Sequence, residues 1–403
     1  QGTATKDVSD VTIYLVHGGN WKFTMNFGQD SSFAGTKTPQ GNQDANSVGD
    51  FYYAPPTGFL ALCTKSLPSV DVIPSENFNT VIYTGNGSST HAITNVGFTP
   101  DWVWAKQRNT TRSHRLLDSV RGAGVYLASD NTNAESSASG LFKTFDSDGF
   151  TLDAANALNQ SGGTYVAWNW KLGGSAVSNT NGSATSQVLA NVDAGISIAT
   201  FTLPTTATTI GHGLSKAPEL VIHKGRVSGS AWWTFHKDIG NTSAVRLDST
   251  SAAGASTNFW NNTSPTSTVV TIGANSGGNN SWMMYCFHSV DGYSKVGSFI
   301  GNGSETAGPF VYCGFKPKFL LVKRATAAGS WFLFDTERSP YNVMNAKLSA
   351  ENSGAEESDT SWNIDFLSNG FKLRSPHVYM NSGSNTHIFI AFAETPFKHS
   401  NSR

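Results

Sequence analysis

The sequence has little charge. Lys, Arg, Asp and Glu make up 14% of its 403 residues, compared with about 25% in a typical soluble domain. The formal net charge is −1, so the chain lacks the positive excess that attracts nucleic acids or anionic membranes. We therefore expect no nucleic-acid partner. The polar surface must come from Ser, Thr, Asn and Gly, which suits a secreted or particle-borne protein.

Cysteine and long apolar runs are also scarce. The 3 cysteines are too few and too far apart to form a disulfide framework. Cys286 and Cys313 lie in apolar stretches, so we expect both to be small core residues. Every apolar run is shorter than the roughly 18–20 residues that a bilayer crossing needs. No membrane insertion is expected.

Helical periodicity with capping residues is missing from most of the chain. Short helical turns are expected around Ser119–Gly122 and Glu337–Asn342. Elsewhere, short β-branched and aromatic segments alternate with turn residues, a pattern typical of antiparallel β-sandwiches. The fold class predicted is all-β, with tandem antiparallel β-sandwich domains. In the first such domain we expect strands at Val81–Thr84, Trp102–Lys106, Tyr126–Ala128, Gly149–Leu152 and Tyr165–Lys171.

A long pattern is written three times along the chain. Tyr83-Thr-Gly-Asn-Gly-Ser and Gly97-Phe-Thr-Pro-Asp-Trp-Val-Trp-Ala-Lys-Gln-Arg correspond to Phe299-Ile-Gly-Asn-Gly-Ser and Gly314-Phe-Lys-Pro-Lys-Phe-Leu-Leu-Val-Lys-Arg. A more divergent copy begins at Ile210-Gly-His-Gly-Leu-Ser-Lys. The period, near one hundred residues, exceeds the roughly 20–50 residues of solenoid units. Each copy is therefore expected to be a small sandwich with its own core, like beads on a string.

The copies define the domain boundaries that we expect. Repeat one spans 77–182, repeat two 183–292 and repeat three 293–403. The stretch from Gly173 to Gly182 is rich in Gly, Ser, Asn and Thr, which favours a flexible connection. Residues 1–76 look like the end of a further β module plus a linker, with strands expected at Val11–Val16 and Trp21–Phe27.

Pairs of residues with turn chemistry recur at equivalent points. Asp148-Gly149 and Asn369-Gly370 each lie between apolar positions, which is a strong signal for a two-residue hairpin turn. The acidic run Asp146-Ser-Asp-Gly149 has a faint likeness to a calcium loop, but the acidic residue that would complete the spacing is missing. A turn is the favoured interpretation.

Tryptophans on alternating strand positions are the candidate binding residues. Trp102 and Trp104 should point to one face of their strand, as should Trp168 and Trp170. Such side chains most often build a core. The alternative is a platform on which sugar rings stack, and these four tryptophans are the residues that would form it.

Polar candidates for catalysis or metal binding are weak. Asp118-Ser-Val-Arg121 and Asp335-Thr-Glu-Arg338 match each other in repeats one and three, but repeat two has Phe235-His-Lys-Asp in that place. A local ion pair explains them better than a catalytic base. His223, His236 and His288 all belong to repeat two without zinc-ligand spacing, and nucleotide and hydrolase motifs are missing. We expect no catalytic residue, no metal and no cofactor.

These residues resemble a repeated domain of tailed-bacteriophage proteins. The likeness rests on Tyr-Thr-Gly-Asn-Gly, Gly-Phe-x-Pro-Asp-Trp-Val-Trp-x-Lys-x-Arg, His114-Arg-Leu-Leu-Asp-Ser-Val-Arg-Gly and Tyr165-Val-Ala-Trp-Asn-Trp-Lys. Proteins with this domain occur in marine and cyanobacterial phages as tail-fibre or virion proteins. Repeat two departs from the pattern. Asn26-Phe-Gly-Gln-Asp and Pro55-Pro-x-Gly-Phe-Leu-Ala-Leu-Cys resemble the end of a SPRY-like module, so the full gene product is expected to be longer.

The resemblance implies a structural virion protein that is not an enzyme, and it supplies no catalytic residues to transfer to this sequence. It implies a tail-fibre or appendage component that attaches to a host-surface glycan or receptor, assembles with other virion proteins and forms a homotrimer. Two alternatives stay open. One is a glycan-binding adhesin or lectin-like module. The other is a capsule polysaccharide depolymerase, whose paired acids would be Asp146 with Asp148 or Glu356 with Glu357.

Overall fold

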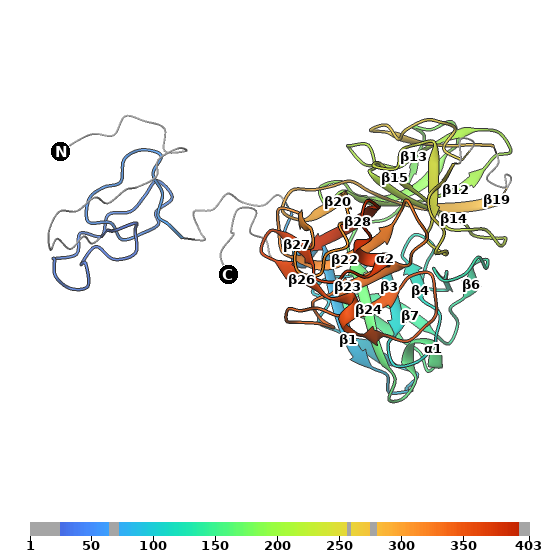
Figure 1. Cartoon of the computed structure of the whole chain (residues 1–403), viewed down its shortest axis with the longest axis horizontal. Coiled ribbons are helices and arrows are strands. Elements are labelled where there is room, and N and C mark those ends of the chain that lie inside the picture. The colour runs from blue at the N-terminus through green and yellow to red at the C-terminus, as the bar shows by residue number, and fades with distance from the viewer. Residues whose placement is uncertain (1–24, 64–71, 256–258, 275–279, 395–403) are drawn as a thin grey trace. The chain divides into compact units, whose positions relative to one another are not determined.

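The structure is a computed structural model that describes residues 25–63, 72–255, 259–274 and 280–394 (Figure 1). The chain divides into two compact units, Gln1–Pro68 and Ser69–Arg403. The strands expected at Val11–Val16 and over most of Trp21–Phe27 lie outside the described residues. The second unit contains all three repeats, and its antiparallel sheets confirm the all-β prediction.

The described part of the first unit is built from turns. Among residues 25–63, strand pairing is limited to a bridge between Asn42 and Phe51. Acidic side chains hold its loops by accepting backbone N–H groups. Asp44, for example, accepts from Asn46 and Val48 with Oδ1 and from Ala61 with Oδ2.

Repeat one consists of a four-stranded sheet and a three-stranded sheet. The larger sheet has the order β1 (Phe78–Thr84), β9 (Thr164–Trp170), β3 (Trp102–Gln107) and β4 (Arg115–Asp118). The smaller has the order β2 (His91–Ile93), β8 (Gly149–Leu152) and β7 (Phe142–Asp146). A further pair joins β5 (Val125–Tyr126) to β6 (Ser136–Ser137).

Repeat two has the largest sheet, with eight strands in the order β10-β11-β12-β19-β14-β15-β16-β17. Its strands are β10 (Val177–Asn179), β11 (Ser186–Asn191), β12 (Ile196–Leu203), β14 (Leu220–Gly225), β15 (Trp233–His236), β16 (Ser243–Arg246), β17 (Gly254–Ala255) and β19 (Asn280–Phe287). The second sheet pairs β13 (Thr208–Gly211) with β18 (Val269–Ile272).

Repeat three repeats the plan with six and three strands. The larger sheet has the order β20 (Ser294–Ile300), β28 (Thr386–Ala393), β22 (Pro317–Arg324), β23 (Trp331–Asp335), β24 (Ala346–Ser349) and β25 (Glu357–Ser358). The smaller has the order β21 (Phe310–Tyr312), β27 (Gly370–Leu373) and β26 (Ile364–Leu367).

Helices are short, and two local expectations about them were wrong. Ser119–Gly122 and Glu337–Asn342 form turns and bends. The helices of the described residues are instead α1 (Asn156–Asn159), α2 (Val378–Asn381) and the 3₁₀ turns η3 (Pro74–Glu76) and η4 (Thr360–Trp362). Within the described ranges, none of them combines the length and the hydropathy that a bilayer crossing requires.

The stretch Gly173–Gly182 is not simply a flexible connection, which corrects a second expectation. It contains β10, which pairs with β11 through Val177 opposite Val188. This strand falls inside the range expected for repeat one but belongs to the sheet of repeat two. The three residues of β10 pair with three residues of β11, and this pairing outweighs the low strand propensity of the Gly- and Ser-rich residues around them.

Both predicted hairpins form, with the turn placed one residue earlier than expected. Asp146 pairs with Gly149 and Leu367 pairs with Gly370, so each glycine begins a strand instead of completing the turn. A Cβ at Gly149 would lie 2.0 Å from the Ile93 carbonyl oxygen, and one at Gly370 would lie 2.0 Å from that of Val311. The glycines are therefore required by the close approach of a neighbouring strand.

Each repeat has its own core between its two sheets. In repeat one this core includes Val103, Ala105, Phe150 and Leu152. Repeats two and three have corresponding clusters. Cys286 and Cys313 are buried in those clusters, as expected of small core residues.

The larger sheets are also apolar on the opposite face, and there the three repeats share one further core. We call the core between the two sheets of one repeat its private core, and the core common to the three repeats the shared core. Because side chains alternate along a strand, Val103 and Ala105 lie in the private core and Trp102 and Trp104 lie in the shared core. Equivalent positions of the three repeats meet there: Trp102, Trp104, Trp168 and Trp170 from repeat one, Leu220, Ile222, Tyr285 and Phe287 from repeat two, and Phe319, Leu321, Ile390 and Phe392 from repeat three.

The shared core corrects the picture of three beads on a string. Figure 1 shows the three repeats as neighbouring lobes, blue to green, yellow-green and orange to red, around a common centre. A space of about 10 Å³ is left where residues of all three meet, no more than a single water needs. The repeats therefore form one tightly packed body.

We expect Trp170→Ala to destabilise all three repeats together. Trp170 stacks on Trp102 with ring centroids 4.1 Å apart and contacts Phe392 of repeat three edge-on. Removing such a buried ring costs about 3–5 kcal/mol. Hydrogen exchange in increasing urea should show the same loss of protection in peptides covering β9, β19 and β28.

Tyr341→Ala provides the control, because this side chain is 83% exposed and its loss should change the unfolding free energy by less than about 0.5 kcal/mol. A loss of protection confined to the strands of repeat one would show that the repeats unfold independently.

Candidate functional site

The four candidate tryptophans are not available to a ligand, which corrects the glycan-platform alternative for them. Trp102, Trp104, Trp168 and Trp170 are each at most 1% exposed. Their rings contact one another and Phe319, Tyr285 and Phe392. They are core residues, and sugar rings have no face of them on which to stack.

The Asp118–Arg121 pair lies at the interface between repeats one and two. Arg121 Nε donates to Asp118 Oδ2 at 2.6 Å, and both side chains are fully buried. Arg121 Nη1 also lies 3.2 Å from Glu135, whose carboxylate receives a bidentate contact from Arg226 of repeat two at 3.0 Å per bond. The hydroxyl of Tyr285 donates to Asp118 at 3.0 Å. These residues form a four-membered ion chain, Asp–Arg–Glu–Arg.

The interface between repeats three and one carries the same chain. Arg338 Nε lies 2.5 Å from Asp335 and Arg338 Nη1 lies 3.1 Å from Glu356. Arg108 of repeat one then binds Glu356 through two bonds of 2.9 and 2.7 Å. Burial acts to raise the pKa of Glu356, but the hydrogen bond from Arg108 and the charge of Arg338 outweigh it and lower the pKa.

Among the described residues, the third interface, between repeats two and three, has no equivalent of this ion chain. Strand register places His236 where the other repeats have Asp118 and Asp335. Ala253 donates its backbone N–H to the carbonyl of Ala325, as Glu135 does to that of Arg226. Ala325 and Ala253 thus replace the arginine and the glutamate, and both pack against the shared core.

Another contact recurs at all three interfaces. A ring N–H of one repeat donates to a carbonyl of the next in a closed cycle: His114 to Ser349, Trp232 to Ala128 and Trp331 to Arg246, at 3.0, 2.9 and 2.8 Å. The repeats are therefore related by an approximate threefold arrangement within one chain.

Three equivalent lysines are buried beside these contacts. Lys106, Lys224 and Lys323 are 0% exposed, and burial lowers the pKa of each to about 8. Each ammonium donates to a carbonyl, and that of Lys224 reaches Thr132 of the neighbouring repeat at 3.1 Å. Lys323 likewise reaches the carbonyl of Thr250 in repeat two at 3.3 Å, so Lys224 and Lys323 join neighbouring repeats, whereas Lys106 binds the carbonyl of Gln107 in its own repeat.

The calcium-loop candidate is a structural turn. Asp148 accepts the backbone N–H groups of Asn95 and Gly97 at 3.0 and 2.7 Å, and these bonds lower its pKa. Asp146 accepts the hydroxyl of Thr151 at 2.6 Å. Both carboxylates are therefore engaged by the protein itself.

The three histidines of repeat two lie in different surroundings. His223 is stacked between Phe201 and Trp282 in the private core, whereas His236 ends β15 and His288 follows β19. Within the described ranges, no group of three or more His, Cys, Asp or Glu side chains is arranged to hold a metal ion.

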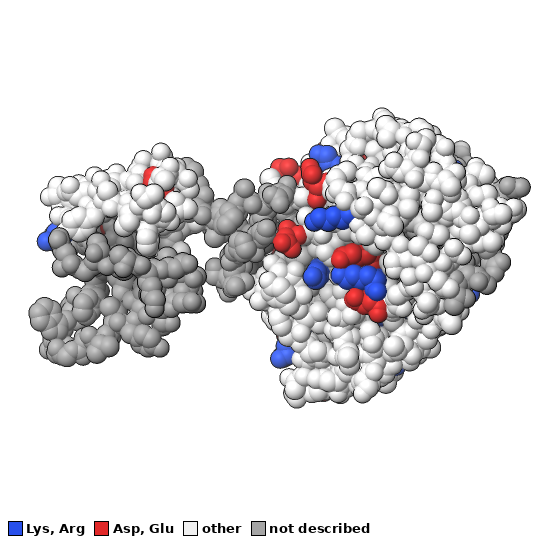
Figure 2. All heavy atoms as spheres, turned by 90° about the horizontal axis from the view of Figure 1, so that it is seen from above, with Lys and Arg blue, Asp and Glu red and all other residues white. Residues whose placement is uncertain are grey.

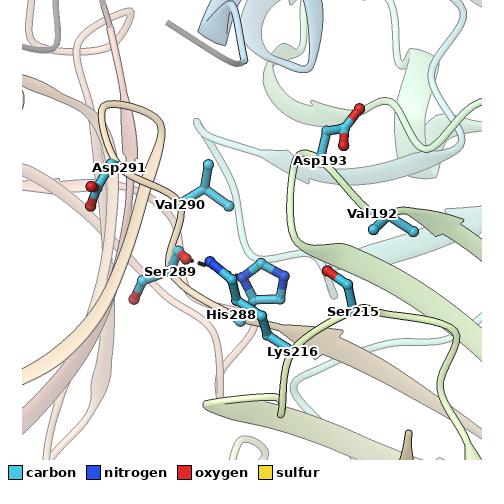
Figure 3. A pocket seen from close by; sticks show the side chains of 8 residues that line it. All are labelled: Val192, Asp193, Ser215, Lys216, His288, Ser289, Val290 and Asp291. Carbon is cyan, nitrogen blue, oxygen red and sulfur yellow. Dashed lines mark hydrogen bonds between the residues drawn. The ribbon is translucent and has the colours of Figure 1, made fainter. Parts of the chain in front are cut away.

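A hollow of about 360 Å³ on repeat two, which we call the polar pocket, is a candidate site (Figure 3). Its lining comes from the β11–β12 turn, the loop before β14 and the segment after β19: Val192, Asp193, Ser215, Lys216, His288, Ser289, Val290 and Asp291. Figure 3 shows Asp193 and Asp291 on opposite sides, with His288 and Lys216 between them in this view. The pocket therefore combines charges of both signs with hydroxyls and two valines.

The base of the polar pocket is held by hydrogen bonds. Glu219 Oε2 accepts the backbone N–H of Ser289 at 2.8 Å and also its hydroxyl. The Ser289 carbonyl lies 3.0 Å from Nδ1 of His288, which assigns the proton to that nitrogen. Burial and the charge of Lys216 lower the pKa of His288, so the ring is neutral at pH 7.

Sequence reasoning named His288 but missed the rest of the polar pocket. A usable signal lay in the repeats themselves. Four positions separate Gly97 from Asp101, but six separate Gly213 from the equivalent Glu219. The loop of repeat two is thus two residues longer, and Ser215 and Lys216 lie in it.

We expect Glu356→Gln to weaken the unit strongly. The substitution leaves Arg108 and Arg338 without their shared carboxylate, and breaking a buried ion pair in this way costs about 3 kcal/mol. Urea unfolding followed by tryptophan fluorescence measures the loss. The neighbouring Glu357→Gln is the matched control, because Glu357 is 57% exposed in its pair with Lys347 and should cost less than about 1 kcal/mol. Equal losses in the two variants would contradict a cohesive role for the ion chain.

We expect His223 to make the protein sensitive to acid. Burial, together with the charge of Lys224, lowers its pKa to about 3, and neither ring nitrogen has a hydrogen-bond partner among the residues that the structure describes. The unfolded chain therefore binds a proton first, and this site loses about 2–3 kcal/mol of stability between pH 7 and pH 4.5. In His223→Phe the fall in unfolding free energy over that range should be smaller by this amount. A variant with the same pH dependence as the wild type would refute the assignment.

Comparison with known proteins places the repeats in one family. Searches of curated proteins and of solved structures gave no match. A family model described as a domain of unknown function (DUF7483) matches residues 73–396. The matched span contains all three repeats and their shared core, and the chain therefore belongs to this family of unknown function.

Proposed function

We propose that the chain is a structural component of a phage particle, a tail-fibre or appendage protein that takes part in assembly and host-surface attachment. The proposal begins from the resemblance of the repeat motifs to tailed-phage proteins. It places the protein in the virion as a homotrimer, in contact with other virion proteins and a host-surface glycan or receptor. It assigns the chain no enzymatic activity.

The observation that carries the proposal is the use of buried polar groups at the repeat interfaces. The two ion chains and the ring N–H contacts all join one repeat to the next. Such groups are costly to bury and must be fully partnered. Because these polar residues hold the repeats together, we expect the repeats to resist local unfolding. Resistance to local unfolding suits a protein on the outside of a particle.

The surface supports an assembly role. Figure 2 shows a face of the Ser69–Arg403 unit on which most exposed residues are uncharged and the charged ones of both signs lie close together. A surface of this kind lets copies pack without repulsion between like charges. Compatibility with close packing is what a fibre or appendage subunit requires.

The acids considered for a depolymerase already have structural partners. Asp146 and Asp148 hold the β7–β8 turn. Glu356 belongs to an ion chain and Glu357 pairs with Lys347 at 2.9 Å. A glycosidase needs two carboxylates facing each other across a groove, so these assignments favour a role without glycan cleavage.

The lectin-like alternative is favoured by one observation in the first unit. Tyr52 and Tyr53 pack edge to face with centroids 4.9 Å apart, and Tyr53 is 78% exposed. They line an apolar hollow of about 350 Å³ with Phe27 and Phe59. Exposed paired aromatics on a loop are suited to stacking on sugar rings. Under this alternative, Tyr53→Ala would abolish binding to host cells.

Particle analysis tests the leading proposal. Antibodies raised against the purified chain should label particles of a phage that encodes it in immunogold electron microscopy, and mass spectrometry of those particles should contain its peptides. Light scattering of the purified protein should give about three times the chain mass of 43.0 kDa. A monomer that is missing from particles would overturn the proposal.

A depolymerase would be revealed by a separate assay. Incubation of the protein with host capsule should release no new reducing ends. Their appearance, and their loss in a variant lacking Asp146 or Glu357, would replace the structural role by an enzymatic one.

A further inference from the structure

We infer that the polar pocket of repeat two binds one neutral sugar unit of a host-surface glycan. The inference rests on the proposed function and deepens it, because it assigns the attachment contact to particular residues. The pocket volume of about 360 Å³ lies at the lower end of the roughly 300–1,000 Å³ typical of small-molecule sites.

The polar pocket lies where repeat two differs from its sister repeats. Strands β10 and β11, which precede β12, extend its sheet on one side, and the β11–β12 turn contributes Val192 and Asp193. Ser215 and Lys216 lie in the loop that is two residues longer than in repeat one. The contacts that recur in all three repeats hold the repeats together. The polar pocket is built in part from segments that only repeat two has, so these contacts do not explain it.

His288 provides the observation that points to a ligand. The side chain lines the pocket, is 4% exposed, and its Nε2 has no hydrogen-bond partner among the described residues. With the proton on Nδ1 held by the Ser289 carbonyl at 3.0 Å, Nε2 is an acceptor. An unsatisfied buried acceptor is unfavourable, and a ligand that donates an O–H bond to it removes that penalty.

The remaining groups fit a polyhydroxylated ligand. The Asp193 carboxylate and the Ser215 hydroxyl can accept O–H donors, while Lys216 and Ser215 can donate to ring or hydroxyl oxygens. Val192 and Val290 supply apolar surface for the C–H face of a sugar ring. Each chemical feature of a pyranose therefore has a counterpart in the lining.

The charge balance favours a neutral ligand over an anion. The lining contains two carboxylates, Asp193 and Asp291, and one ammonium, Lys216, and Nε2 of His288 is an acceptor. A sulfate, phosphate or uronic acid would meet a net negative lining and would lack an imidazolium donor. A hexose or an N-acetylhexosamine avoids both penalties.

Selective labelling of histidine provides the direct test. Protein carrying ¹³Cε1-histidine has 10 such positions, and the His288 signal is identified by its loss in His288→Gln. Methyl glycosides of glucose, galactose, mannose, N-acetylglucosamine and N-acetylgalactosamine are titrated at millimolar concentration. At least one should shift the His288 signal in a saturable manner while His91 and His377 stay in place, and inorganic sulfate should not.

Two rim substitutions and a control complete the test. Asp193→Ala should raise the dissociation constant about tenfold, the effect of losing one hydrogen bond to a charged group. Ser215→Trp should block the mouth and abolish the shift. Both residues are exposed, so the folding of the variants is checked by an unchanged urea midpoint. Lys37→Ala, an exposed lysine of the first unit, should leave the dissociation constant unaltered.

The outcomes separate the pocket from the proposed function. A protein that is found in particles and binds host cells, but whose His288 signal responds to none of the glycosides, retains the proposed function and refutes the pocket. A saturable response that Ser215→Trp abolishes, in a protein missing from particles, upholds the pocket and refutes the virion role. A response to sulfate alone would refute the assignment of a neutral ligand.

Discussion

The fold depends on the burial of both faces of the three larger sheets. In β3 every residue from Trp102 to Gln107 is buried, with alternate side chains in the private and the shared core. A repeat on its own would cover the first face and leave the second in water. Exposing one tryptophan forfeits about 4–6 kcal/mol, for 150–250 Å² at about 25 cal/mol per Å². Association of the copies is therefore a condition for their folding.

The ion chains add specificity to an association that the apolar core already drives. A buried salt bridge contributes little net stability, but an unpaired buried charge is costly. If Arg226 met the Ala253 surface in place of Glu135, its guanidinium would lose both bidentate bonds. Two interfaces that carry an ion chain and one that has alanines in its place thus disfavour any other order of the repeats, whether within one chain or between chains.

The sequence predicted the fold class and some of the elements but not the association of the repeats. Strand composition identified β1, β3, β8 and β9 of repeat one, and alternation placed Trp102 and Trp104 on one face. The run Trp-Val-Trp-Ala is apolar on both faces, which is the pattern of a strand covered on both sides. What covers the outer face lies about one hundred residues away in the chain, beyond any local pattern. β10 was missed for the related reason that its partner strand, and not its own composition, determines it.

The polar pocket was not predicted from the sequence for a different reason. It belongs to one repeat only, so the residues that recur in all three copies do not reveal it. The repeats provide an internal comparison: a position filled alike in all three, such as Lys106, Lys224 and Lys323, serves the common architecture. A position added to one copy is exempt from that constraint. The loop holding Lys216 can change in length without disturbing the shared core, because it lies outside it. Binding properties can therefore diverge in repeat two while the threefold body that supports them stays the same.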